Sequence, residues 1–97
     1  MRPVVVAPRA RRDVERAARW YDNQRDGLGD EFVDEVSAAL VGLAELPERY
    51  PVVHRDLRRA PVERFPYALT FRIVRGVVRV VACTHHRRHP RRWQGRR

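Results

Sequence analysis

Apolar residues in the first half of the chain recur at the spacing of two amphipathic helices. The β-branched run at residues 4–7 predicts a first strand, and Pro8 both ends it and suits the first turn of a helix. A turn at residues 26–29 separates this helix from a second one, which Pro47 ends. The apolar stripes, at helical spacing, are Ala10, Val14, Ala17, Ala18 and Tyr21 in the first helix and Phe32, Val36, Ala39, Leu40, Leu43 and Leu46 in the second. The charged residues Arg11, Arg12, Glu15, Arg16 and Arg19 are predicted to lie on the outer face.

Apolar residues in the second half alternate with polar ones, as in β-strands. Residues 66–74 and 77–84 predict two strands joined by a two-residue turn at Arg75 and Gly76. The segment 53–62 is extended but polar and contains Pro61, so it predicts an edge or irregular strand. The element order is β-α-α-β-β-β. It predicts an α+β fold in which one antiparallel sheet carries an N-terminal helical hairpin on one face, as a single domain over residues 1–97.

The two-residue turn also predicts the register of the last two strands. Arg72 falls opposite Arg79 on the face away from the helices, where like charges repel each other. Either an anion lies between these two side chains or both extend into water. The same face carries Ala68, Val74, Val77, Val81 and Cys83, a half-apolar, half-cationic surface that suits an amphipathic acidic segment of another protein. On the helix-covered face the predicted pairs are Ile73 with Val78, Phe71 with Val80 and Leu69 with Ala82.

The charge of the chain indicates an anionic partner. The formal net charge is +9, and every basic residue is arginine. Guanidinium groups suit phosphate and carboxylate, although a GC-rich coding habit also replaces lysine by arginine. Cys83 is the only cysteine, so no disulfide forms within the chain, and a buried apolar role in a reducing compartment is expected. No apolar run is long enough for a signal peptide or a membrane span, which predicts a cytoplasmic protein without a membrane partner.

Two motifs resemble those of the RelE/ParE toxin superfamily, which includes the plasmid-stabilisation toxins. Residues 64–71, with the sequence RFPYALTF, resemble its RFPY strand, and residues 85–93 resemble its closing H-x-x-R-x-P-x-x-W motif. The predicted element order is also the order of that superfamily. The resemblance implies the toxin component of a type II toxin–antitoxin system, held in a hetero-oligomer by a cognate acidic antitoxin. It also implies a binding surface for the target and the antitoxin made of Arg64, Arg72, Arg79, His85, Arg87, Arg88 and Trp93.

The resemblance leaves two activities open. RelE-like members cut messenger RNA on the ribosome, whereas ParE-like members poison DNA gyrase and lack the nuclease residues. Ala68 stands where RelE-like nucleases carry an arginine, and Trp93 stands near the position of their C-terminal tyrosine, so the ParE-like branch is favoured. A nuclease would instead use His85, His86, Arg87 and Arg88, with Arg72 or Arg79 steadying the phosphate.

Three plainer interpretations accompany these hypotheses. The chain could be a non-toxic, basic, nucleic-acid-binding member of the same superfamily. Trp93 is expected to anchor the C-terminal segment to the domain, and residues 95–97 are expected to fray and to add only charge. No cofactor or metal is expected, because His85, His86 and His89 have no accompanying cluster of carboxylates or thiols.

Overall fold

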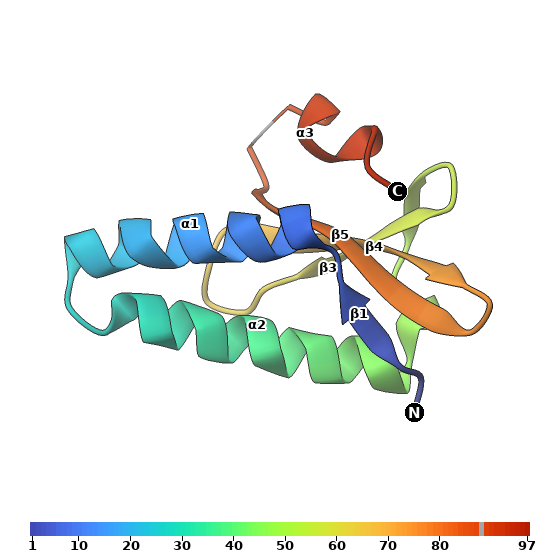
Figure 1. The fold of residues 1–97 in the computed structure, drawn as a ribbon, viewed down its shortest axis with the longest axis horizontal. Helices are drawn as coiled ribbons and strands as arrows, with labels where there is room; N and C mark the ends of the chain where they lie inside the picture. Colours follow the sequence, from blue (N-terminus) through green and yellow to red (C-terminus); the bar gives the residue numbers. More distant parts are fainter. Residues whose placement is uncertain (88) are drawn as a thin grey trace.

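Two long helices follow a short first strand in the computed structural model, which describes residues 1–87 and 89–97 (Figure 1). Strand β1 spans Val4–Val6, helix α1 Pro8–Gln24 and helix α2 Leu28–Glu45. The backbone N–H of Gly29 donates to the Asp22 Oδ1 at 2.7 Å. A Cβ atom at Gly29 would lie 2.4 Å from the Ala18 carbonyl oxygen, so the close approach of the two helices requires glycine there. The predicted helical hairpin is confirmed.

The remaining elements complete a five-stranded sheet. A 3₁₀ turn at Pro47–Arg49 precedes β2 (Val52–His54), β3 (Leu57–Pro61), β4 (Tyr67–Val74) and β5 (Val77–His85), and a short helix α3 spans Arg91–Gln94. The strand order is β1-β5-β4-β3-β2, and the α+β class is confirmed. The sheet is mixed rather than wholly antiparallel, because β1 runs parallel to β5. Parallel neighbours need a long connection, and here the helical hairpin and three strands lie between them along the chain.

The polar segment expected to form one edge strand forms two strands instead. A turn at Arg55, with a φ of 54°, separates β2 from β3. Of these two strands only β2 lies at an edge of the sheet, because β3 pairs with β2 on one side and with β4 on the other. Pro61 is tolerated because it is the last residue of β3.

The β4–β5 register follows the prediction as far as a bulge. Ile73 pairs with Val78, Phe71 with Val80 and Arg72 with Arg79, as predicted. The register then shifts between Thr70 and Phe71, so Leu69 lies opposite Cys83 and not Ala82. One extra residue in β5 turns the following side chains over, as bulges do. Cys83 therefore belongs to the core under the helices, and Ala82 belongs to the opposite face, the reverse of the prediction.

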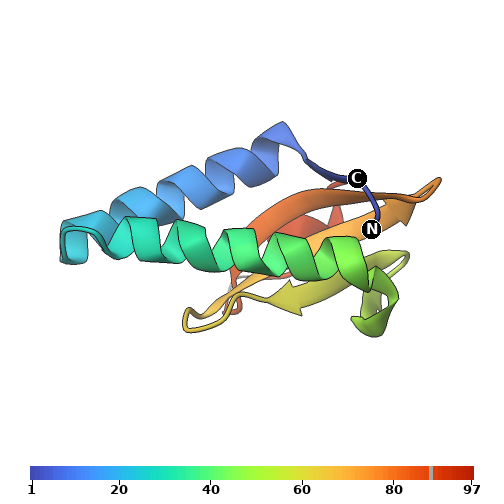
Figure 2. The ribbon, with the colours of Figure 1, turned by 90° about the horizontal axis from the view of Figure 1, so that it is seen from below.

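Each face of the sheet has its own apolar cluster. The face packed against α1 and α2, here called the helix-covered face, holds the large cluster that includes Phe32, Leu43 and Phe71. The face packed against α3, here called the tail-covered face, holds a small cluster of Leu57, Val81, Ala82 and Trp93. The two long helices diverge from their connection across the first of these faces (Figure 2). Within the described residues, no helix is both long and apolar enough to cross a bilayer.

Candidate functional site

The two sequence motifs meet at one end of the sheet. Tyr67 and His85 lie opposite each other in the β4–β5 ladder, with 5.4 Å between their ring centroids. The backbone N–H of His86 donates to the Pro66 carbonyl oxygen at 2.9 Å, and the ring Nδ1 of His86 lies 3.1 Å from that oxygen. Because a carbonyl oxygen only accepts, Nδ1 of His86 carries the proton. The contact between His86 and Pro66 thereby joins the segment at the start of the first motif to the end of β5.

The predicted nuclease histidines form a stacked pair. The rings of His85 and His86 are 4.9 Å apart between centroids. The His85 Nδ1 accepts a hydrogen bond from the backbone N–H of Arg87 at 3.1 Å, so a neutral His85 carries its proton on Nε2. A neutral His86 carries its proton on Nδ1 and therefore has an acceptor at Nε2. The Arg87 side chain is exposed, and Arg88 lies outside the described residues.

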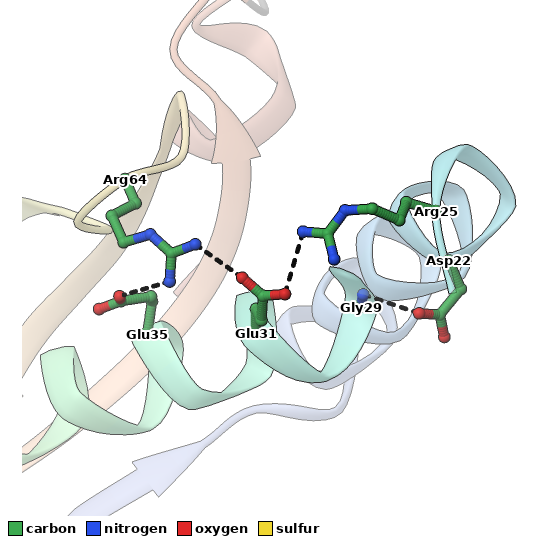
Figure 3. Close-up of polar contacts among 6 residues, drawn as sticks. All are labelled: Asp22, Arg25, Gly29, Glu31, Glu35 and Arg64. Atoms are coloured by element: carbon green, nitrogen blue, oxygen red, sulfur yellow. Dashed lines mark hydrogen bonds and ion pairs between the residues drawn. The ribbon is translucent and has the colours of Figure 1, made fainter. Parts of the chain in front are cut away.

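Arg64 braces the first motif against α2. Its Nη2 donates to the Glu31 Oε1 at 2.7 Å and its Nη1 to the Glu35 Oε2 at 3.4 Å, while Arg25 donates to the second oxygen of Glu31 at 3.0 Å (Figure 3). The hydrogen bonds from Arg64 and Arg25 hold the pKa of Glu31 below its ordinary value, and the bond to Glu31 raises the pKa of Arg64. Arg64, a predicted binding residue, is thus already paired with carboxylates of the same chain.

Arg72 and Arg79 lie opposite each other as predicted, but each donates a hydrogen bond to an acceptor within the chain. The Nε and Nη2 of Arg72 donate to the Asp56 Oδ2 at 3.0 and 2.7 Å, which lowers the pKa of Asp56. The Nε of Arg79 donates to the backbone oxygen of Arg97 at 3.2 Å. These acceptors relieve the expected repulsion without an external anion.

The predicted binding residues divide into separate groups. Arg79 and His85 are six residues apart on β5, which places them roughly 20 Å apart along the strand. Arg72, opposite Arg79, lies equally far from the histidine pair. Neither arginine is therefore placed to steady a phosphate at the histidines, and the expected continuous surface is divided between the two ends of the sheet.

Trp93 holds α3 against the tail-covered face. Its side chain is 4% exposed and belongs to the cluster of Leu57, Val81 and Ala82. The Arg59 guanidinium lies over the indole ring, 5.0 Å from its centroid, and burial lowers the pKa of Arg59. This burial supports the anchor interpretation of Trp93 and removes its ring from a base-stacking role.

A buried ion pair joins the C-terminal segment to α1, and sequence reasoning missed it. Asp13 is 7% exposed; its Oδ2 accepts from the backbone N–H of Cys83 at 3.0 Å and from the guanidinium of Arg96. Arg96 also donates to the Val81 carbonyl oxygen at 3.2 Å. The prediction that residues 95–97 fray is therefore wrong for Arg96. The available signal was Asp13 itself, an acid at helical spacing between Ala10 and Ala17 on the apolar stripe of the first helix.

The only thiol has no reactive character. Cys83 is 2% exposed, and burial together with the nearby charge of Asp13 raises its pKa to about 12. A thiolate is the nucleophilic and metal-binding form of cysteine, so this environment opposes both roles. Nowhere in residues 1–87 and 89–97 do three His, Cys, Asp or Glu side chains gather as a possible metal site.

An apolar groove of about 450 Å³ lies between α1 and α2. Its floor includes Val14, Val36 and Leu40, and Val33 at its edge is 39% exposed. Three residues that we predicted on the outer face of the first helix, Arg11, Glu15 and Arg19, line this groove instead. The divergence of the two helices, visible in Figure 2, brings these exposed side chains to the rim.

A second hollow, of about 520 Å³, lies beside the histidine pair, between α1, the ends of β4 and β5, and α3. Its lining comprises Asp13, Arg16, Ala17, Trp20, Tyr21, Pro66, Tyr67, Cys83, Thr84, His85, Arg92 and Arg96. We refer to it as the α1–α3 cavity.

Comparison with known proteins agrees with this arrangement. Residues 4–90 match the family described as "ParE toxin of type II toxin-antitoxin system, parDE". A chain of the solved structure "Chromosomal ParDE TA system from P. aeruginosa" is similar in fold, with a TM-score of 0.79 and 15% sequence identity; the match covers 88% of this chain and 96% of that one. None of the curated proteins matches. Since the family match spans nearly the whole chain, the protein belongs to the ParE toxin family of type II toxin–antitoxin systems.

Proposed function

We propose that this toxin acts by binding DNA gyrase, without hydrolysing a substrate, and that an acidic antitoxin neutralises it. The observation that carries the non-hydrolytic mode is the tail-covered face. Ala68 is buried there at 8% exposure, and Trp93 is packed as an anchor, at the two positions where RelE-like nucleases carry an arginine and a tyrosine. Arg72 and Arg79 lie too far from the histidines to replace the missing groups.

The groove between α1 and α2 is the proposed antitoxin site. Its floor is apolar, and its rim carries Arg11 and Arg19, eight residues and therefore about 12 Å apart along α1, with Glu15 between them. An amphipathic helix with an apolar face and flanking carboxylates complements such a groove. The net charge of +9 favours the approach of an acidic chain.

Paired substitutions test the groove. Val33→Asp places a charge at the groove edge, whereas Val41→Asp makes the same change on α2 outside the groove, at a residue that is 51% exposed. We expect the antitoxin encoded beside this gene to co-purify with Val41→Asp and to protect cells from it, but to lose both effects with Val33→Asp. Equal protection against both variants would place the antitoxin elsewhere.

Brief expression without the antitoxin tests the target. We expect loss of plasmid supercoiling and arrested replication while messenger RNA stays intact. Purified gyrase should lose supercoiling activity when the toxin is added. Codon-phased cleavage of translated messages would contradict the gyrase proposal, and unimpaired growth would favour the non-toxic alternative.

Ribosome-dependent cleavage of messenger RNA remains the second candidate because of the stacked histidines. RNA cleavage needs groups that transfer protons, and the imidazole rings of His85 and His86, stacked with 4.9 Å between centroids, are groups of that kind. If this candidate is right, His86→Gln abolishes message cleavage and Arg91→Gln, an exposed neighbour on α3, does not.

A further inference from the structure

The α1–α3 cavity combines cationic groups with an aromatic wall. Arg16 enters from α1, whereas Arg92 and Arg96 enter from the C-terminal segment, so positive charge faces the cavity from two opposite elements. The aromatic side consists of Trp20, Tyr21 and Tyr67. Trp20 is 56% exposed and meets the Tyr21 ring edge-on, with 5.1 Å between centroids. A large exposed indole beside guanidinium groups is a feature of sites that bind both a ring and an anion.

Hydrogen-bond donors in this cavity outnumber acceptors. Asp13 is the only carboxylate in its lining, and Arg96 and the N–H of Cys83 already occupy it. The Nε of Arg96 is buried without a partner in the described part of the chain. The side chain of Arg92 likewise has no hydrogen bond or ion pair to any residue of 1–87 and 89–97, and that of Arg16 has only a 3.9 Å contact with Asp13. The guanidinium groups of Arg16 and Arg92 are exposed and therefore available to an anion in the cavity.

Thr84 is the strand residue between Cys83 and His85 in the lining of the cavity. It is 8% exposed, lines the cavity, and its Oγ1 is buried without a partner among the described residues. A buried hydroxyl normally has a hydrogen-bond partner, because leaving it unpaired costs about 1–3 kcal/mol. Thr84 and the arginines belong to different elements, but all of these residues line the same hollow.

We propose that the α1–α3 cavity binds a nucleoside monophosphate, either as the free nucleotide or as the terminal nucleotide of a strand. The phosphate accepts hydrogen bonds from Arg16 and Arg92, and the base lies against Trp20. The volume of about 520 Å³ lies within the range of small-molecule sites. Stacking on an aromatic ring and bidentate binding of phosphate by arginine are the two interactions that nucleotides use most readily. This site is separate from the antitoxin groove, and it requires neither gyrase nor the antitoxin.

Isothermal titration calorimetry of the full chain with adenosine 5′-monophosphate tests the site. We expect Arg16→Gln and Arg92→Gln each to weaken binding by about tenfold, as loss of a charge-assisted hydrogen bond to phosphate does. The matched controls Arg12→Gln and Arg91→Gln remove the same charge from the same two helices outside the cavity, and they should bind within twofold of the unaltered chain. Trp20→Ala should weaken binding of the nucleotide but not of inorganic phosphate.

Each alternative result overturns the proposal in a recognisable way. Equal losses in all four arginine variants would mean that the nucleotide responds only to overall charge. Adenosine binding as tightly as its monophosphate would mean an apolar pocket with no phosphate site.

A trinucleotide distinguishes the two possible ligands, the free nucleotide and the terminal nucleotide of a strand. Binding that requires its 5′-phosphate, and that Arg92→Gln weakens, identifies the terminal nucleotide as the ligand. Binding without the 5′-phosphate and insensitive to Arg92→Gln, together with no binding of the mononucleotide, would exclude the cavity.

Discussion

The two faces of the sheet are stabilised in different ways. The helix-covered face packs against two helices of 17 and 18 residues and buries Phe32, Phe71 and Leu43 completely. The tail-covered face packs against a helix of four residues and relies on one large side chain, Trp93. It also buries polar atoms of Arg59 and Thr70 that have no partner in the described chain.

The helix-covered face therefore provides most of the stability of the fold. The tail-covered face contributes less, so its residues can vary with function at a smaller cost in stability. Apolar burial is the main stabilising contribution, and nearly all of it lies under the two long helices. The tail-covered face and the α1–α3 cavity depend on a C-terminal segment held by Trp93 and by the pair of Asp13 with Arg96.

Truncation of one aromatic residue on each face should have the largest effect and the clearest contrast. Phe32 contacts the rings of Tyr21, Phe65 and Tyr67 at 5.1–5.4 Å between centroids, in a core that cannot collapse around a cavity. We expect Phe32→Ala to lower the free energy of unfolding by about 4 kcal/mol and Trp93→Ala by about 2 kcal/mol, because α3 can relax. Urea titration followed by circular dichroism measures both. Equal losses would mean that the tail-covered face is an equal part of the core.

Breaking the link between the faces should have the next largest effect. Asp13→Asn leaves the mostly buried Arg96 guanidinium without its counter-charge, and the expected loss is about 3 kcal/mol. The C-terminal segment should also become sensitive to protease while the helices stay protected. Asp34→Asn, an exposed acid on α2 with no resolved partner in the described chain, is the control and should change little. Protection of the C-terminal segment in Asp13→Asn would show that its other contacts, chiefly that of Trp93, hold it without the ion pair.

Two adjacent arginines on β3 allow a finer comparison of the faces. Arg58 points to the helix-covered side, where its Nη1 donates to the carbonyl oxygens of Tyr50 and Glu48 at 2.7 and 3.0 Å. Arg59 points to the tail-covered side, with its Nε and Nη2 buried and unpaired in the described structure. We expect Arg58→Met to cost about 2 kcal/mol and Arg59→Met to be neutral or stabilising by about 1 kcal/mol. Thermal unfolding of both variants measures the two changes in stability. A loss of stability in Arg59→Met as large as that in Arg58→Met would mean that stacking of Arg59 on Trp93 outweighs the cost of its buried, unpaired donors.

Local patterns in the sequence were sufficient for most of the helix-covered face. Helical spacing and the breaks at Gly27 and Pro47 predict the hairpin, and the Arg75–Gly76 turn predicts the β4–β5 register near it. The bulge further along β5 was not predictable, because Val80, Val81 and Ala82 are all apolar and do not alternate.

The tail-covered face and the cavity were harder to predict because their contacts join residues that are far apart in the sequence. Asp13 and Arg96 are 83 positions apart, and no local pattern pairs them. The motif residues His85 and Tyr67 were identified from the sequence, but the cavity beside them also needs Arg16 and Trp20 from α1. Only the packing of α1 across the sheet brings those side chains to the site.

The smallest expected effect concerns one exposed carboxylate beside each face. Arg64 lowers the pKa of Glu31 from 4.5, and Arg72 lowers that of Asp56 from 3.8. A carboxylate whose pKa is depressed in the folded state stabilises the fold above its ordinary pKa, and this contribution is lost as the pH falls through the folded value. Glu31→Gln should therefore lower Tm by about 1–2 °C at pH 7 and have no effect well below pH 4.5.

Asp56→Asn should show the same pattern shifted to lower pH, with its effect disappearing only well below pH 3.8. Both differences should shrink in high salt, because both pairs are exposed to solvent. Calorimetric Tm values between pH 2.5 and 7 compare the two variants. If instead either difference persists in acid, that carboxylate acts through packing or a neutral hydrogen bond, and the ion pair at that face contributes nothing measurable.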